Sequence, residues 1–197
     1  MSKKNFDVVV YGATGFTGKL VVEYMLNQYG DDETISWAMA GRSHEKLVAV
    51  RDALGVSKDV PLLTVDSDDE ESIIQMVQQT QCVLTTVGPY QLYGPNIVKQ
   101  CVAHGTDYVD LCGEPGWMHE MINEHAAQAK ETGARIVFSC GFDSIPFDLG
   151  VYFLQNKVIA EHGKPASNIR GRVRAMNGEF SGGTAASLSA TMASLKE

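Results

Sequence analysis

Residues 6–18 decide the fold, and they read Phe6-Asp7-Val8-Val9-Val10-Tyr11-Gly12-Ala13-Thr14-Gly15-Phe16-Thr17-Gly18. The first six residues form a short apolar run that predicts a buried strand. Three glycines spaced three residues apart follow, and a helical pattern begins at Phe16. A strand, a glycine-rich turn and a helix in this order are typical of a dinucleotide-binding unit.

Each of the three glycines has a separate expected role in that unit. Gly12 permits the tight turn, Gly15 lets the backbone approach a pyrophosphate, and Gly18 lets the helix pack closely on the sheet. The free backbone N–H groups and the dipole at the start of the helix attract an anion. We therefore predict that residues 12–18 bind a dinucleotide; the alternative is a tight turn that binds nothing.

The residues after the second predicted strand indicate which dinucleotide is bound. The ribose hydroxyl of NAD commonly meets an acidic side chain there, whereas the 2′-phosphate of NADP needs a cation. Residues 36–44 contain no carboxylate, but they contain Arg42, with Ser43 and Lys46 as further donors. This pattern predicts NADP as the cofactor, unless Arg42 is a solvated surface arginine. Asp66 is expected either beside the adenine or as a helix cap.

The remainder of the chain alternates short apolar runs with helical patterns. We expect helices over residues 16–29, 44–54, 69–77, 93–104 and 116–131. The strands expected before, between and after them are residues 6–11, 35–40, 61–65, 82–87, 108–111 and 135–138. Such alternation predicts the α/β class, with a Rossmann-type doubly wound parallel sheet in an NADP-binding domain over residues 1–145.

The pattern changes after residue 145. We expect a connecting helix at about residues 146–161 and a final helix from residue 182 to residue 197. Between them, residues 168–176 alternate apolar and basic side chains, which predicts a half-exposed strand. We expect residues 146–197 to be the connecting helix and the start of a second α+β domain that is cut short. The chain would then be incomplete for catalysis.

Composition limits the classes of partner. The chain is 44% hydrophobic and 20% charged, as in soluble globular proteins, and its formal net charge is −8. An acidic chain is a poor match for nucleic acid. We see no signal peptide and no transmembrane segment, and the four cysteines form no C-x-x-C pair, so we expect a cytoplasmic protein. The five histidines have no metal-ligand spacing, so no metal is expected.

The loops that follow the fourth, fifth and sixth strands are candidates for chemistry, because the carboxyl ends of parallel strands share one edge. They contain Val87-Gly88-Pro89-Tyr90, Gly113-Glu114 and Asp143-Ser144. We expect Val87, Gly88 and Pro89 beside the nicotinamide, Tyr90 as a hydrogen-bond donor, and Glu114 and Asp143 in acid–base or substrate-orienting work. The alternatives are that Glu114 and Asp143 cap the next helices and that Tyr90 packs under its loop.

Several segments together resemble one family. Residues 11–18, 40–43, 87–94 and 140–146, in this order, resemble the saccharopine dehydrogenase-like oxidoreductases, which include the mycobacterial trans-acting enoyl reductases. Asp107-Tyr108-Val109-Asp110, leading to Gly113-Glu114, is also similar to that family, and so is Ser181-Gly182-Gly183-Thr184. The resemblance implies an N-terminal NADP-binding Rossmann domain beside a second α+β domain, in proteins about twice this long.

The resulting functional hypothesis is an NADP-dependent oxidoreductase that transfers hydride to or from an imine, enoyl or carbonyl group of a small-molecule substrate. The sequence does not choose among these groups. Short-chain dehydrogenases are excluded because no tyrosine has a lysine four residues later. Two alternatives stay open: a non-catalytic NADP(H)-binding sensor or regulator, and a dimerising platform that forms a homodimer through the second domain.

Overall fold

The computed structural model describes residues 4–30, 32, 34–178 and 182–194. In these residues the strands form one sheet in the order β3-β2-β1-β4-β5-β6, and every neighbouring pair is parallel. This arrangement confirms the predicted Rossmann-type doubly wound sheet. The strands are β1 (Phe6–Tyr11), β2 (Trp37–Gly41), β3 (Leu62–Thr64), β4 (Thr80–Thr85), β5 (Asp107–Val109) and β6 (Ile136–Val137).

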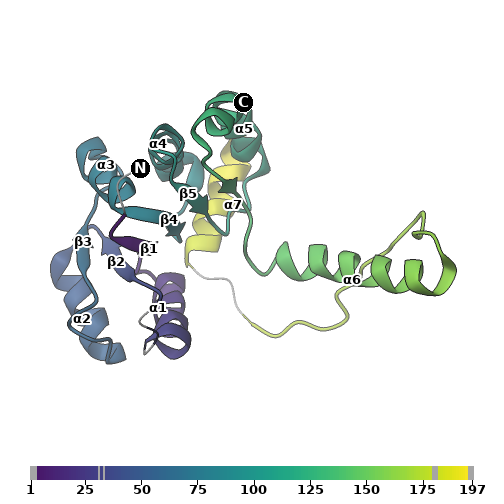
Figure 1. The fold of residues 1–197 in the computed structure, drawn as a ribbon, viewed down its shortest axis with the longest axis horizontal. Coiled ribbons are helices and arrows are strands. Elements are labelled where there is room, and N and C mark those ends of the chain that lie inside the picture. Colours follow the sequence, from purple (N-terminus) through teal and green to yellow (C-terminus); the bar gives the residue numbers. More distant parts are fainter. Residues whose placement is uncertain (1–3, 31, 33, 179–181, 195–197) are drawn as a thin grey trace.

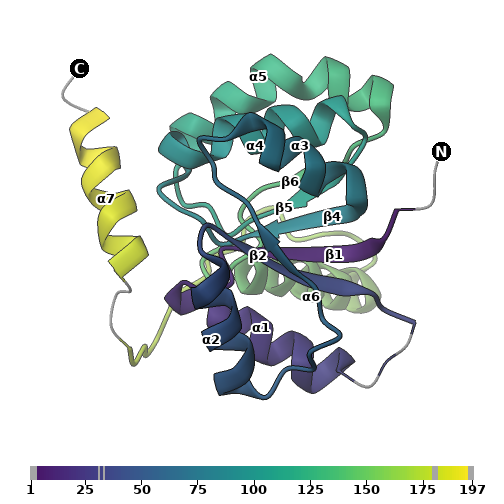
Figure 2. The ribbon, with the colours of Figure 1, turned by 90° about the vertical axis from the view of Figure 1, so that its left-hand side faces the viewer.

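Helices cover both faces of the sheet (Figure 2). On one face lie α1 (Phe16–Tyr29) and α2 (His44–Leu54), and on the other lie α3 (Glu70–Gln79), α4 (Tyr90–Ala103) and α5 (Pro115–Thr132). Successive side chains of β1 alternate between these faces. Val10 packs in the cluster that includes Val22 and Leu47, whereas Val9 packs in the cluster that includes Ile97. Both faces of the central strand are therefore buried, as parallel sheets require.

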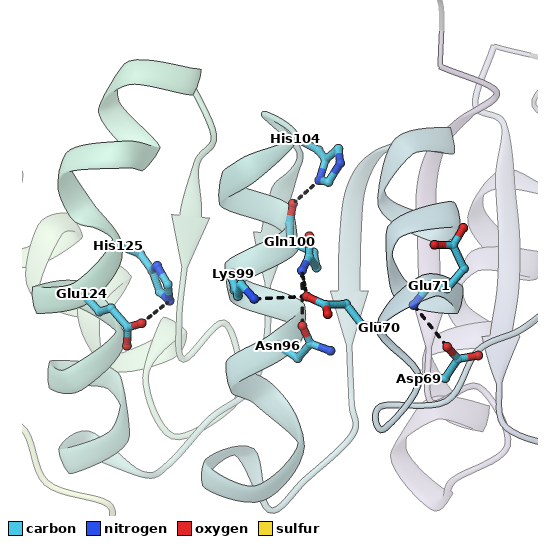
Figure 3. Close-up of polar contacts among 9 residues, drawn as sticks. All are labelled: Asp69, Glu70, Glu71, Asn96, Lys99, Gln100, His104, Glu124 and His125. Atoms are coloured by element: carbon cyan, nitrogen blue, oxygen red, sulfur yellow. Dashed lines mark hydrogen bonds and ion pairs between the residues drawn. The ribbon is translucent and has the colours of Figure 1, made fainter.

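Side-chain caps fix where α2 and α3 begin, and hydrogen bonds between side chains join α3 to α4. The Ser43 hydroxyl accepts the backbone N–H of Lys46 at the start of α2. Asp69 caps α3 by accepting the N–H of Glu71 at 3.1 Å (Figure 3). In the same view, the Glu70 carboxylate lies between the two helices and accepts hydrogen bonds from Lys99 and Gln100 of α4.

The first helix has the predicted bounds but an apolar outer face. Gly18, Val22 and Met25 are buried, whereas Leu20 and Tyr24 are 51% and 58% exposed. Helical spacing alone cannot decide between these two faces, because both carry apolar side chains.

The chain beyond β6 differs from the sheet domain. Helix α6 (Ile145–His162) extends away from the sheet and has no buried residue (Figure 1). The predicted strand over residues 168–176 is wrong, because this segment is irregular and exposed. Alternation fixes which side chains share a face, but a strand also needs a neighbouring strand to pair with. None of the described helices is long and apolar enough to cross a membrane.

The last described helix stands beyond the carboxyl ends of the strands (Figure 2). It is α7 (Gly182–Ser194), and the predicted continuation to residue 197 lies outside the described residues. Ser187 of α7 is half-buried, and its hydroxyl oxygen lies 3.6 Å from the point where a Cβ on Gly88 would be. A segment about 100 residues from β4 in sequence therefore reaches the loop that follows β4.

Candidate cofactor-binding site

A cavity of about 220 Å³ opens where β1, β2 and β4 end. Its walls come from the loops after four strands, and β1 lies between β2 and β4. The strand order therefore reverses beside the cavity, which is where open α/β sheets bind their ligands. The lining residues are Tyr11, Gly12, Thr14, Gly15, Gly41, Arg42, Ser43, Lys46, Ser67, Thr86, Val87 and Tyr93.

Two of the three loop glycines are required by the fold itself. Gly12 has φ +89°, and a Cβ there would lie 2.8 Å from the Thr86 hydroxyl oxygen. A Cβ on Gly18 would lie 2.0 Å from the Gly12 carbonyl oxygen. Side chains at these two positions would force the backbone apart, because such contacts are far inside van der Waals distance.

Gly15 differs from these two because a side chain there would require only a small shift of its neighbour. A Cβ there would have one neighbour within 4 Å, the Gly12 carbonyl oxygen at 3.3 Å. Gly15 also lines the cavity, with ordinary extended backbone angles of φ −74° and ψ 170°. The missing side chain at Gly15 thus leaves space for a ligand rather than for the protein's own packing.

The start of α1 borders this space through its N-cap residue, Gly15. No side chain caps the helix within the described part of the chain, and its first backbone hydrogen bond runs from Lys19 N–H to the Gly15 carbonyl. The amides of residues 16–18 precede that bond and have no helical carbonyl to pair with. These amides and the helix dipole suit an anion such as a pyrophosphate.

Part of the cavity wall is cationic and hydroxylic. Arg42, Ser43 and Lys46 line it, and no carboxylate is among the lining residues that the structure describes. This donor set fits the 2′-phosphate of NADP rather than a bare ribose hydroxyl.

Sequence reasoning missed Tyr11 and Ser67 on this side. Burial raises the pKa of Tyr11 to about 12, and the Asp66 carboxylate acts in the same direction, whereas the Ser67 hydrogen bond and Arg42 lower it. The Tyr11 hydroxyl is therefore protonated near neutral pH and lies close to Asp66, Ser67 and Arg42. The position of Tyr11 directly before Gly12, at the end of a buried strand, is the signal that could have found it.

The predicted cofactor residues divide into two groups. Gly12, Thr14, Gly15, Arg42, Ser43 and Val87 line the cavity. Asp66 is not among the lining residues; its carboxylate accepts the Asp68 N–H in the turn before α3. The other predicted residues that do not line the cavity are Ala13, Phe16, Thr17, Gly18, Gly88 and Pro89. The cofactor role of each residue stays a prediction.

The loop after β4 is tied to the glycine-rich turn. The Thr86 backbone N–H donates to the Tyr11 carbonyl at 2.9 Å, and the Thr86 hydroxyl donates to the Gly12 carbonyl at 3.3 Å. Thr86 was not among the predicted residues, although it directly precedes Val87. Its two bonds hold the loop after β4 against the cavity.

Glu114 serves the start of α4, although it is the N-cap residue of α5. One carboxylate oxygen accepts the Tyr90 N–H at 3.0 Å, and the other accepts the Gln91 N–H at 2.9 Å. Glu114 is only 3% exposed. It therefore caps a neighbouring helix, and this cap lets α4 begin at Tyr90 rather than at the predicted residue 93.

The side chain of Tyr90 points into the core. It is 4% exposed, its hydroxyl donates to the Thr85 carbonyl at 3.4 Å, and its ring centroid lies 5.8 Å from that of Trp117. Burial raises the pKa of Tyr90, so the phenol stays protonated. This geometry favours the packing alternative for Tyr90.

Asp110 is a buried carboxylate that the functional prediction did not include. One of its oxygens accepts the N–H groups of Cys112 at 3.0 Å and Ser139 at 2.8 Å. The other accepts the Tyr108 hydroxyl at 2.8 Å. Asp110 thus joins the loops that follow β5 and β6. Burial raises its pKa, which the three hydrogen bonds partly offset.

Asp143 lies apart from the other two predicted catalytic residues. It is exposed, does not line the cavity and precedes Ser144, the N-cap residue of α6. The structure therefore brings Tyr90 and Glu114 together at the start of α4, and it places Asp143 on the surface after β6.

Comparison with known proteins identifies the family. Residues 8–137 match the saccharopine dehydrogenase NADP binding domain family. A Mycobacterium tuberculosis protein whose name describes a trans-acting enoyl reductase is 46% identical over 186 residues, which are 94% of this chain and 44% of that protein. A Caenorhabditis elegans protein named lipid droplet localized protein is 47% identical over 155 residues, which are 76% of this chain and 36% of that protein.

A solved structure shares the fold. The apo saccharopine dehydrogenase (L-Glu forming) of Saccharomyces cerevisiae aligns with a TM-score of 0.62 at 17% identity, over 80% of this chain and 32% of that one. The chain spans less than half the length of the relatives that it matches. The resemblance seen in the sequence is confirmed: the chain belongs to the saccharopine dehydrogenase family and contains the NADP-binding domain of that family.

Proposed function

We propose that this chain is the cofactor-binding part of an NADPH-dependent reductase that acts on a small molecule, with the double bond of an enoyl group as its first-choice substrate. The observation that carries the proposal is the cavity beside Gly15, which joins an uncapped helix start to a cationic wall without a carboxylate. The name of the M. tuberculosis relative supports the enoyl group over an imine or a carbonyl.

The cavity and the helix start beside it each have a part in this proposal. The amides of residues 16–18 hold the pyrophosphate, and Arg42 and Lys46 hold the 2′-phosphate. The loop that contains Val87 and Gly88 borders the nicotinamide. When bound, NADPH supplies the hydride, so the chain's own residues bind, orient and exclude water.

The three predicted catalytic residues take different parts. Both oxygens of Glu114 accept backbone N–H groups, and the Tyr90 hydroxyl bonds inside the core. We assign these two to the framework of the site rather than to proton transfer. Asp143 has an exposed carboxylate, and we keep it as the group that orients the substrate or relays a proton.

Turnover by the full-length protein tests this proposal. NADPH consumption, followed by absorbance, should be fastest with an enoyl thioester and slower with an imine or a ketone of similar size. Faster turnover of the imine or ketone would contradict the substrate choice. Tight NADPH binding without turnover of any of the three would favour the sensor alternative.

A pair of variants tests Asp143. Asp143→Ala should lower turnover without weakening NADPH binding, whereas Asp148→Ala, an exposed acid in the first turn of α6, should leave both unchanged. Equal turnover by the two variants would contradict the role of Asp143.

A cytoplasmic location and a homodimer formed through the part after residue 145 also remain predictions. Cell fractionation tests the location, and light scattering tests the oligomeric state.

A further inference from the structure

The loop after β4 is held at both ends by the protein itself. At its near end, Thr86 bonds to the carbonyls of Tyr11 and Gly12. At its far end, the N–H groups of Tyr90 and Gln91 bond to the Glu114 carboxylate. Residues 87–89 therefore lie between two attachments, one to the glycine-rich turn and one to the buried Glu114, which follows Tyr90 by 24 residues.

The far attachment is a charge-assisted one. Glu114 is 3% exposed, so its carboxylate has lost most of its hydration, and the two N–H groups and the dipole of α4 replace it. A second buried acid, Asp110, joins the adjacent loops by accepting the N–H groups of Cys112 and Ser139. Two buried carboxylates thus fix the loops after β4, β5 and β6.

We propose that Glu114 is a positioning residue for the nicotinamide half of the cofactor. Its carboxylate fixes the start of α4, and through α4 it fixes residues 87–89 beside the cavity. Glu114 does not line the cavity, in which the adenosine half would meet Arg42, Ser43 and Lys46. The inference rests on the proposed placement of NADPH, but it needs no substrate and no turnover.

Glu114→Gln tests the proposal with little change in side-chain volume. The amide keeps one acceptor oxygen, but its NH₂ group must face a backbone N–H, so one of the two bonds is lost. We expect the affinity for NADPH to fall by up to about tenfold, because the lost bond releases the start of α4 and lets residues 87–89 move away from the position that orients the nicotinamide. Affinity for 2′,5′-ADP, which lacks the nicotinamide, should stay within about twofold of the wild-type value. The fluorescence of the bound nicotinamide should also change.

Asp107→Asn is the matched control. Asp107 lies at the opposite, amino end of β5, and its carboxylate also accepts a backbone N–H, that of Arg135 at 2.9 Å, besides bonding the guanidinium. The variant should lower the free energy of unfolding but change neither ligand affinity. If it weakens NADPH binding as much as Glu114→Gln does, general destabilisation explains both results and the proposal is wrong.

Three other results decide the proposal. Unchanged NADPH affinity and fluorescence in folded Glu114→Gln would overturn it, and so would an equal loss of NADPH and 2′,5′-ADP affinity. If Glu114→Gln does not fold, Glu114→Asp keeps the charge but shortens the side chain by one methylene, and a smaller loss confined to NADPH would support the proposal. A wild-type protein that binds NADPH without turning over any substrate would count against the proposed reaction alone.

Discussion

Two helices begin at the same edge of the sheet, and their starts are used in opposite ways. Helix α1 follows β1 and begins without a side-chain cap, beside a cavity. Helix α4 follows the neighbouring strand β4, and the Glu114 carboxylate occupies its start. Both positions offer backbone N–H groups and a positive dipole to an anion. The protein fills the start of α4 with its own carboxylate, and we propose that a ligand fills the start of α1.

The difference divides the site into an open half and a fixed half. The open half, at the start of α1, has Gly15 and the cationic side chains of Arg42 and Lys46, and we propose that an anionic ligand balances their charge. The α4 half is closed by internal hydrogen bonds, so its geometry is set before a ligand arrives. Such prearranged geometry is what orientation of a reacting ring requires.

Closing the open half should have the largest effect. Gly15→Val places a branched side chain where the pyrophosphate must lie, while the extended backbone at Gly15 accepts it. We expect NADPH affinity to fall by at least about a hundredfold, with the fold preserved. Titration calorimetry and circular dichroism measure the two quantities.

Gly18→Ala provides the contrast for that variant. The Cβ of the new alanine would clash with the Gly12 carbonyl oxygen. We therefore expect Gly18→Ala to lose much of its thermal stability, whereas Gly15→Val should lose mainly NADPH affinity. If Gly15→Val keeps its NADPH affinity, the pyrophosphate does not lie at the start of α1. The proposed difference in use between the starts of α1 and α4 would then be wrong.

Removing a cation from the open half should have a moderate and selective effect. Arg42→Ala should weaken NADPH binding by about tenfold or more and leave NADH binding nearly unchanged, because only NADPH carries the 2′-phosphate. Arg51→Ala is the control, since Arg51 lies on α2, the helix that follows Arg42, bonds to Asp52 and does not line the cavity. An equal loss of affinity for NADPH and NADH would show that Arg42 binds a part that the two cofactors share, and not the 2′-phosphate.

The open half was largely predictable from sequence, because its determinants are local. Residues 6–18 contain the strand, the turn and the start of the helix, and β1 and α1 have the predicted bounds. Arg42 is equally local, since it directly follows a strand whose apolar run is plain. Ser67 was missed because it belongs to no recognisable motif, whereas Tyr11 directly precedes Gly12 at the end of a buried strand, a position that could have marked it.

The fixed half was harder to predict, because it depends on contacts between distant residues. The true start of α4 depends on Glu114. The sequence of residues 86–93 contains no pattern that indicates a cap from a residue 24 positions later. The same contact decides that Glu114 is buried. The predicted strand at residues 168–176 failed for a related reason, since pairing also depends on what lies beside a segment.

The smallest expected effects are pH dependences at the two ends of β5. Burial raises the pKa of Asp110 above its ordinary 3.8. The stability linked to its protonated form is therefore full below pH 3.8 and is lost as the pH rises through the raised value. Burial also raises the pKa of Asp107, but the hydrogen bonds from Arg135 outweigh it and the net shift is downward. Its contribution is present above pH 3.8 and is lost as the pH falls.

Urea unfolding of Asp107→Asn and Asp110→Asn from neutral pH down to about 3 measures these slopes. Relative to Asp110→Asn, the wild type should gain stability as the pH falls toward 3.8. Relative to Asp107→Asn, it should lose stability below that value. Slopes of the same sign would show that the fixed half is not held by a buried acid of raised pKa.

Calorimetric titration of the wild-type protein with NADPH, NADH and 2′,5′-ADP tests whether the open half, with its uncapped helix start and its cationic wall, binds NADP(H). We expect NADPH to bind at least about tenfold more tightly than NADH, and 2′,5′-ADP to compete with NADPH. Equal affinity for NADPH and NADH, or NADPH binding that 2′,5′-ADP does not displace, would contradict this expectation.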